Sequence, residues 1–124
     1  MKLSSIECRK YISAFKSGVV PYGDLSPISI GRDSLLEEYE ICMDDISNGA
    51  SFVKFLCGEY GSGKTFMLRR IMNKALNRLF IVSTIQVGRN MRINNFESIY
   101  YNIMHNLFVR HKKGEKSSFE NIFD

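Results

Sequence analysis

Apolar side chains recur every three or four positions in four parts of the chain, which is the spacing of one face of an amphipathic helix. The pattern predicts helices over Ser5–Lys16, Ser34–Ile46, Lys64–Arg78 and Asn95–His111. Local signals support these bounds. Gly18 follows the basic last turn of the first helix, and Asn48 and Gly49 follow the second, as glycine often does at a helix end.

Two short apolar runs predict strands. Ser51–Cys57 is too short for a typical helix and stops at a glycine, and Leu79–Val87 is rich in β-branched residues. Between the first two helices, Val19–Gly31 is interrupted by Pro21, Gly23 and Pro27, which is typical of an extended connection that contains turns. The resulting order of elements predicts an α/β layered fold with a parallel sheet and flanking helices.

Composition narrows the class of protein. The chain has 124 residues, 44% of them hydrophobic and 24% charged, which is typical of one folded domain and excludes a disordered or low-complexity chain. The net charge of +4 is too small to indicate a nucleic-acid binder by itself. Its three cysteines are widely spaced and predict neither a disulfide framework nor a zinc knuckle. With no apolar run near the roughly 18 residues of a membrane span, we expect a cytoplasmic protein.

One motif carries chemistry. Gly58-Glu59-Tyr60-Gly61-Ser62-Gly63-Lys64-Thr65 fits the phosphate-loop pattern G-x-x-x-x-G-K-[S/T] at every fixed position. It lies between a predicted strand and a predicted helix, where glycines let backbone N–H groups surround an anion at the positive end of the helix. Lys64 would reach the β- and γ-phosphates, and the Thr65 hydroxyl would ligate Mg²⁺. A dinucleotide fingerprint is excluded, because it would need glycine at position 66.

Other segments have two interpretations. Ile28–Asp33 could lay backbone and an apolar edge against adenine, or it could be an ordinary turn into a helix. Asp44 and Asp45 follow an apolar run, as in a magnesium-binding strand, but their helical phasing favours solvated helix positions. A basic cluster could contact DNA, although a solvated helix end is the favoured interpretation; it consists of Arg110, His111, Lys112, Lys113 and Lys116.

Several of these segments together resemble the ATP-binding proteins of bacterial BREX phage-defence systems, which are P-loop ATPases of the AAA+ superfamily, similar to its origin-recognition and STAND branches. The resemblance spans nearly the whole chain and rests on residues 16–21, 23–26, 31–33, 58–66, 95–100 and 106–107. It implies ATP and Mg²⁺ as ligands, and it implies that Gly31 and Arg32 lie beside the base. The implied nucleotide-binding set is Gly58, Glu59, Tyr60, Gly61, Ser62, Gly63, Lys64, Thr65, Phe66, Gly31 and Arg32, with Thr65 as the Mg²⁺ ligand.

The resemblance also implies a domain plan. Residues 1–124 correspond to the N-terminal part of a P-loop ATP-binding domain, with a helical lead-in (1–50), a strand–loop–helix–strand–helix core (51–111) and a polar tail (112–124). In the AAA+ arrangement the two predicted strands are not neighbours, so we expect an incomplete sheet with exposed edges. Longer family members continue into an acidic strand, a sensor residue and an arginine finger, and these have no counterpart here. No catalytic residue is therefore assigned, and hydrolysis is expected to be absent or very slow.

Two other functions compete with ATP binding. The chain could be an interaction fragment or DNA-associated fragment of a defence complex with a vestigial nucleotide site. A kinase or GTPase shares the loop class, but the Gly-Glu-Tyr-Gly sequence argues against both, and the lack of an N-K-x-D motif argues against a GTPase. The partners that the resemblance implies are other defence-system proteins or further subunits of an AAA+-type oligomer, with no membrane.

Overall fold

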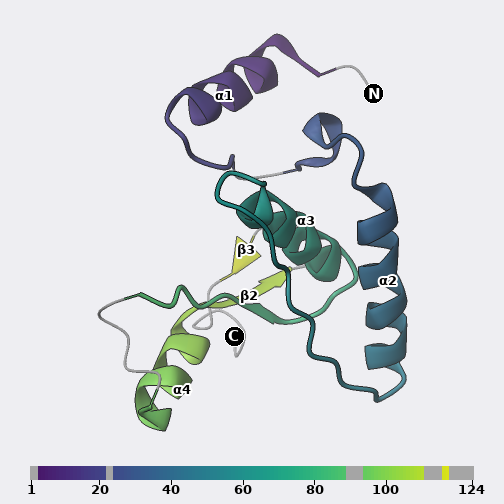
Figure 1. Ribbon diagram of the computed structural model, residues 1–124, viewed down its shortest axis with the longest axis vertical. Helices are drawn as coiled ribbons and strands as arrows, with labels where there is room; N and C mark the ends of the chain where they lie inside the picture. The colour runs from purple at the N-terminus through teal and green to yellow at the C-terminus, as the bar shows by residue number, and fades with distance from the viewer. Residues whose placement is uncertain (1–2, 22–23, 89–93, 111–115, 118–124) are drawn as a thin grey trace. The chain divides into compact units, whose positions relative to one another are not determined.

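The computed structural model describes residues 3–21, 24–88, 94–110 and 116–117 (Figure 1). Contacts divide the chain into two compact units, Met1–Asn73 and Lys74–Asp124, and each is described by itself. The elements in chain order are α1 (Ser5–Lys16), the 3-10 turn η1 (Ser26–Ile28), α2 (Asp33–Ser47), α3 (Lys64–Asn77), β1 (Val82–Ser83), α4 (Phe96–His105), β2 (Leu107–Arg110) and β3 (Lys116–Ser117). None of the helices in these ranges is long and apolar enough to cross a membrane.

Helix α1 has the bounds that the sequence predicts. Its start is fixed by a capping box: the Glu7 N–H donates to the Ser4 hydroxyl (3.3 Å) and the Ser4 N–H donates to the Glu7 carboxylate (2.8 Å). The helix is tied to the connection that follows it by Tyr11, whose hydroxyl donates to the Asp24 carbonyl at 2.6 Å. Tyr11 and Leu25 are both buried, so this connection contributes to the core of the first unit.

Helix α2 extends the predicted range by one residue at each end. Leu36 and Met43, two turns apart on one face, are its buried residues, and Met67 of α3 is also fully buried. Asp44 and Asp45 are exposed helical residues, which confirms the interpretation drawn from their phasing. Helix α3 begins at Lys64, as predicted, and ends one residue before the predicted bound.

The predicted strand Ser51–Cys57 is wrong. The chain forms no regular structure there, and Val53 and Phe55 are 82% and 86% exposed. A strand exists only through hydrogen bonds to a neighbour, and no described residue pairs with this segment. The segment contacts α2 through Lys54, whose ammonium lies 3.4 Å from the Glu38 carboxylate and 5.1 Å from the centre of the Tyr39 ring.

The predicted parallel sheet is also wrong for the described residues, whose strand pairings are antiparallel. β1 pairs with β2 (Val82 opposite Phe108), and β2 pairs with β3 (Val109 opposite Ser117), which gives the order β1-β2-β3. Helix α4 is capped by Asn95 but ends at His105, six residues before the predicted bound. The run after it is apolar and fits a strand as well as a helix, and pairing with β1 selects the strand.

The remaining predictions concern the C-terminal segment. Most of the predicted polar tail, 112–124, lies outside the described residues, and so do His111, Lys112 and Lys113 of the basic cluster. The division of the chain at residues 50 and 111 stays a prediction.

The Tyr11 hydrogen bond generates a stability test. Replacing Tyr11 with Phe removes the hydroxyl and leaves a half-buried carbonyl without its donor, so we expect a loss of about 1 kcal/mol in the free energy of unfolding. Urea unfolding of the two proteins measures it. Tyr100→Phe, at a more exposed tyrosine on α4, is the matched control and should change stability little. Equal destabilisation by both substitutions would contradict the role given to Tyr11.

Candidate functional site

The glycine-rich loop, Gly58–Gly63, leads directly into α3. A turn closes within it, where the Ser62 N–H donates to the Glu59 carbonyl at 3.2 Å. Gly61 and Gly63 have φ angles of +79° and +84°, in the left-handed region that other residues rarely adopt. The Gly63 carbonyl accepts the first helical hydrogen bond, from the Met67 N–H at 3.0 Å. The loop is therefore a tight turn whose end is also the cap of a helix.

Lys64, the first residue of α3, folds back over this loop. Its ammonium donates to the carbonyls of Gly58 (2.7 Å) and Glu59 (2.6 Å) and lies 3.4 Å from the Ser62 hydroxyl. Three oxygens of the loop thus surround one cation, which has three protons to donate. The positive charge lies beside the N-terminus of α3, where the helix dipole adds positive potential. This arrangement favours the binding of an anion, whose oxygens could replace the loop carbonyls as acceptors for the Lys64 ammonium.

Arg32 joins the connection before α2 to the glycine-rich loop. Its Nη2 donates to the Ser62 carbonyl, and its guanidinium lies over Gly63, where an added Cβ would be 3.5 Å from Nη2 and 3.7 Å from Cζ. Gly31 has a φ of +73° but no atom within 4 Å of an added Cβ, so it turns the chain without touching the loop. The structure thus brings Arg32 to the loop, 30 residues away in sequence.

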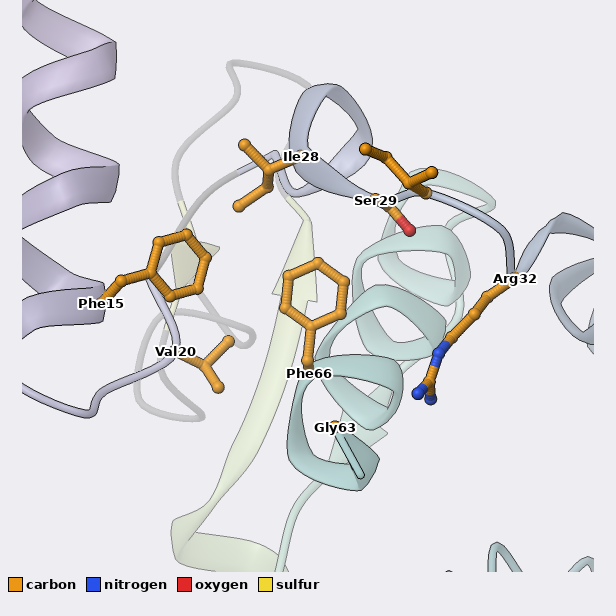
Figure 2. Close-up of a pocket in the computed structure, with 8 residues that line it drawn as sticks. Phe15, Val20, Ile28, Ser29, Arg32, Gly63 and Phe66 are labelled. Carbon is orange, nitrogen blue, oxygen red and sulfur yellow. The ribbon is translucent and has the colours of Figure 1, made fainter. Parts of the chain in front are cut away.

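A pocket of about 420 Å³ lies beside Gly63 (Figure 2). Phe15 comes from α1 and Phe66 from the first turn of α3, and most of the other side chains come from the connection between α1 and α2. The lining is mainly apolar, with Ser29 and Arg32 supplying the polar groups; the full set is Phe15, Val20, Ile28, Ser29, Ile30, Arg32, Gly63 and Phe66. A flat, apolar ligand could therefore lie next to the loop.

Two arginines of α3 hold the walls of this pocket. Arg70, only 8% exposed, donates to the Ser29 hydroxyl and lies 3.7 Å from the Asp33 carboxylate. Arg69 donates to the Val20 carbonyl. Sequence reasoning missed both arginines, because adjacent basic residues on a helix are usually solvated and no spacing rule links them to partners 37 to 49 residues away. Phe15 and Val20 were also missed, because no spacing rule links them to the loop.

The other predicted residues have different surroundings. Glu59 and Tyr60 are exposed, and Tyr60 has no buried surface. Thr65 is exposed on the first turn of α3, and Phe66 is half-buried in the pocket wall. In the described part of the chain, no group of three or more His, Cys, Asp or Glu is placed to hold a metal ion. An accessible Thr65 hydroxyl nevertheless suits Mg²⁺, which commonly takes one or two protein ligands along with phosphates and waters.

Asp24, which precedes η1, has a carboxylate whose pKa is lowered by its surroundings. Hydrogen bonds from the Ser26 side chain and from its backbone N–H (2.9 Å) hold the pKa of Asp24 below its usual range, and the charge of Arg70 lowers it further. Burial acts in the opposite direction. The carboxylate is thus bound as an anion at the turn that leads into η1.

Comparison with known proteins identifies one family. A family model described as BREX system ATP-binding protein BrxC/D matches residues 3–124. No curated protein matches the chain, and no solved structure matches it. The match covers the glycine-rich loop, Arg32 and the pocket, and it agrees with the resemblance drawn from the motifs.

The Asp24 hydrogen bonds generate a pH test. Because the pKa of Asp24 is lower in the folded chain, its carboxylate stabilises the fold above the unfolded pKa of about 3.9, and this contribution is lost as the pH falls through the folded pKa. Between about pH 5 and pH 3, the melting temperature of the wild type should fall more than that of Asp24→Asn. Asp45→Asn, at an exposed position on α2, should behave like the wild type; equal pH dependence in all three proteins would contradict the assignment.

Proposed function

Since the chain belongs to the family of BREX system ATP-binding proteins BrxC/D, we propose that it binds Mg·ATP through Gly58–Thr65 and serves phage defence in this way. The observation that carries the proposal is the placement of Lys64. Its ammonium is held by loop carbonyls at 2.6 and 2.7 Å, at the start of a helix and inside a complete phosphate-loop motif. Among the residues that the structure describes, no other cation lies at the start of a helix within such a motif.

The phosphates would interact with the loop and with α3. N–H groups at the start of a helix lack intrahelical partners, so they can donate to phosphate oxygens, and the helix dipole favours negative charge there. Lys64 would exchange its carbonyl partners for phosphate oxygens, and Thr65 would supply its hydroxyl to the metal. Mg²⁺, when bound, neutralises part of the triphosphate charge. Glu59 and Tyr60 remain exposed and would flank the phosphates.

The base would occupy the pocket beside Gly63. Its volume of about 420 Å³ is within the usual range for small-ligand sites, and its apolar walls suit a flat aromatic ring. Phe66 is one residue beyond the phosphate loop motif and lines this pocket, so it connects the phosphate and base regions. Arg32 also lines this pocket, whereas Gly31, the residue before it, is placed near the base only by the family resemblance.

The finer parts of the assignment are proposals as well. We place the chain in a P-loop, AAA+-type ATPase architecture of which residues 1–124 form the N-terminal part, in the cytoplasm, with other defence proteins or further AAA+-type subunits as partners. Binding is the function assigned to these residues, because the phosphate-loop motif, the contacts of Lys64 and the pocket are features of a binding site; no catalytic residue is assigned. The basic cluster gives no support to DNA binding as a second function, because three of its five residues lie outside the described ranges.

A thermal melt with and without Mg·ATP tests the binding function. A ligand at 100 times its dissociation constant adds about 2.7 kcal/mol of stability, so ATP should raise the melting temperature by several degrees. Lys64→Ala should abolish the shift. Lys16→Ala, at an exposed lysine in the last turn of α1, is the control and should retain it. A wild-type melting temperature that does not change when Mg·ATP is added would refute the proposal.

The base pocket generates a separate prediction. Removing the Phe66 ring should weaken ATP binding about tenfold, since contact of a base with an aromatic ring contributes about 1–3 kcal/mol. Affinity for inorganic tripolyphosphate, which has no base, should be unchanged; calorimetry measures both. Phe55→Ala removes an exposed phenylalanine and is the control. Equal losses for ATP and tripolyphosphate would mean that Phe66 supports the loop rather than the base.

A further inference from the structure

We propose that Arg32 is a positioning residue, which sets the direction of one backbone N–H group in the glycine-rich loop and does not itself contact the nucleotide. The proposal rests on the nucleotide-binding function above, and it differs from the role beside the base that the family resemblance implies. Both contacts of the Arg32 guanidinium are made at the peptide bond between Ser62 and Gly63.

The guanidinium holds this peptide bond in two ways. Its Nη2 donates to the carbonyl of Ser62, and three atoms of the guanidinium would lie 3.5–3.7 Å from a Cβ added at Gly63, toward which Arg32 reaches in Figure 2. A lysine could make the hydrogen bond but could not make the second contact in the same way, because its ammonium is compact and has no planar face. Glycine is needed at position 63 for its φ of +84°, whereas an added Cβ would make ordinary van der Waals contact with Arg32.

The consequence follows from peptide geometry. In a trans peptide bond, the C=O and the N–H point in opposite directions. The bond between Ser62 and Gly63 is trans. With the Ser62 oxygen held by Arg32, the Gly63 N–H must point away from Arg32. In the proposed site this N–H is one of the donors that surround the phosphates, so Arg32 would orient a phosphate ligand from the opposite side of the loop.

Arg32 can do this because its own backbone is fixed. Its carbonyl accepts from the N–H of buried Leu36 at 3.2 Å, which anchors it at the start of α2. On either side, Ser29 and Asp33 are both held by buried Arg70. The guanidinium therefore extends from a rigid stretch of backbone, so it can hold the Ser62 carbonyl in a fixed place.

A positioning role and a contact role predict different losses. If Arg32 touched the base, its removal would weaken ATP but not inorganic pyrophosphate, and if it touched the γ-phosphate, it would weaken ATP more than ADP. If it orients the loop, the loss is the same for every ligand that occupies the phosphate site. The three ligands therefore separate the two roles.

The test uses the full chain and the variants Arg32→Ala and Arg32→Lys. By calorimetry, Arg32→Ala should bind Mg·ATP, Mg·ADP and magnesium pyrophosphate each about tenfold more weakly, as expected for one lost charge-assisted hydrogen bond. Arg32→Lys should recover part of the affinity for all three. Millimolar guanidinium should restore binding to Arg32→Ala but not to Lys64→Ala, which lacks a different cation.

A second readout needs no ligand and remains informative for a poorly stable variant. In the nucleotide-free protein, the amide resonance of Gly63 should move in Arg32→Ala and return toward its wild-type position in Arg32→Lys. The amides of Gly18 and Gly49, which follow other helices of the same unit, should stay in place. A general loss of structure would instead move all three.

The outcomes separate the two proposals. Unchanged affinities in Arg32→Ala, a loss confined to base-bearing ligands, or a change in the ATP-to-ADP ratio would overturn the positioning role while leaving nucleotide binding intact. A wild type that binds none of the three ligands would overturn the proposed function. In that case, a Gly63 amide resonance that does not move in Arg32→Ala would overturn the positioning role as well. A resonance that moves in Arg32→Ala and returns in Arg32→Lys would support the control of the loop by Arg32.

Discussion

The first unit depends on a buried charge. Arg70 is nearly inaccessible to water, and a buried guanidinium is costly unless its donors are bound. Its partners are the Ser29 hydroxyl, which lies between the first two helices, and the carboxylate of Asp33, the first residue of α2, so satisfying Arg70 requires that the end of this connection pack against α3. That requirement determines the position of three features: the pocket wall, the start of α2 and Arg32. An apolar residue at position 70 could fill the same space, but it would make no hydrogen bond or ion pair that holds these features in position.

The same constraint explains how distant parts of the chain form one site. The glycine-rich loop is continuous with α3, and α3 carries the arginines that hold the connection, so the loop and the pocket share one rigid element. Arg32 connects the start of α2 to the loop as well, because its guanidinium donates to the Ser62 carbonyl. Membership of the BREX system ATP-binding family gives this geometry a chemical context. Under the proposed function, the loop would bind the phosphates and the pocket would bind the base.

Local signals predicted the helices and the loop well, except for the C-terminal end of α4. The spacing of apolar residues predicted the start of α1, and the motif ending in Lys64 and Thr65 located the start of α3, because these signals act over a few residues. Strands were predicted poorly, since the apolar run around Val53 has no partner strand among the described residues and the run Leu107–Arg110 does. Long-range ties such as Arg69 to Val20 have no pattern in the sequence, because either residue is ordinary until the fold places them together.

The contacts of Lys64 also bear on the rate of ligand capture. Because the ammonium already has three oxygen partners, an arriving phosphate replaces bonds rather than adding them. The free energy gained at this residue is the difference between two sets of charge-assisted hydrogen bonds, and it is smaller than the value for a bare ammonium. Under the proposed function, capture would therefore include an exchange step, whose rate would depend on how readily the carbonyls of Gly58 and Glu59 release the cation. An anion with one or two charges and few oxygens would compete poorly in such an exchange, so the contacts of Lys64 would select for polyphosphates before the base is recognised.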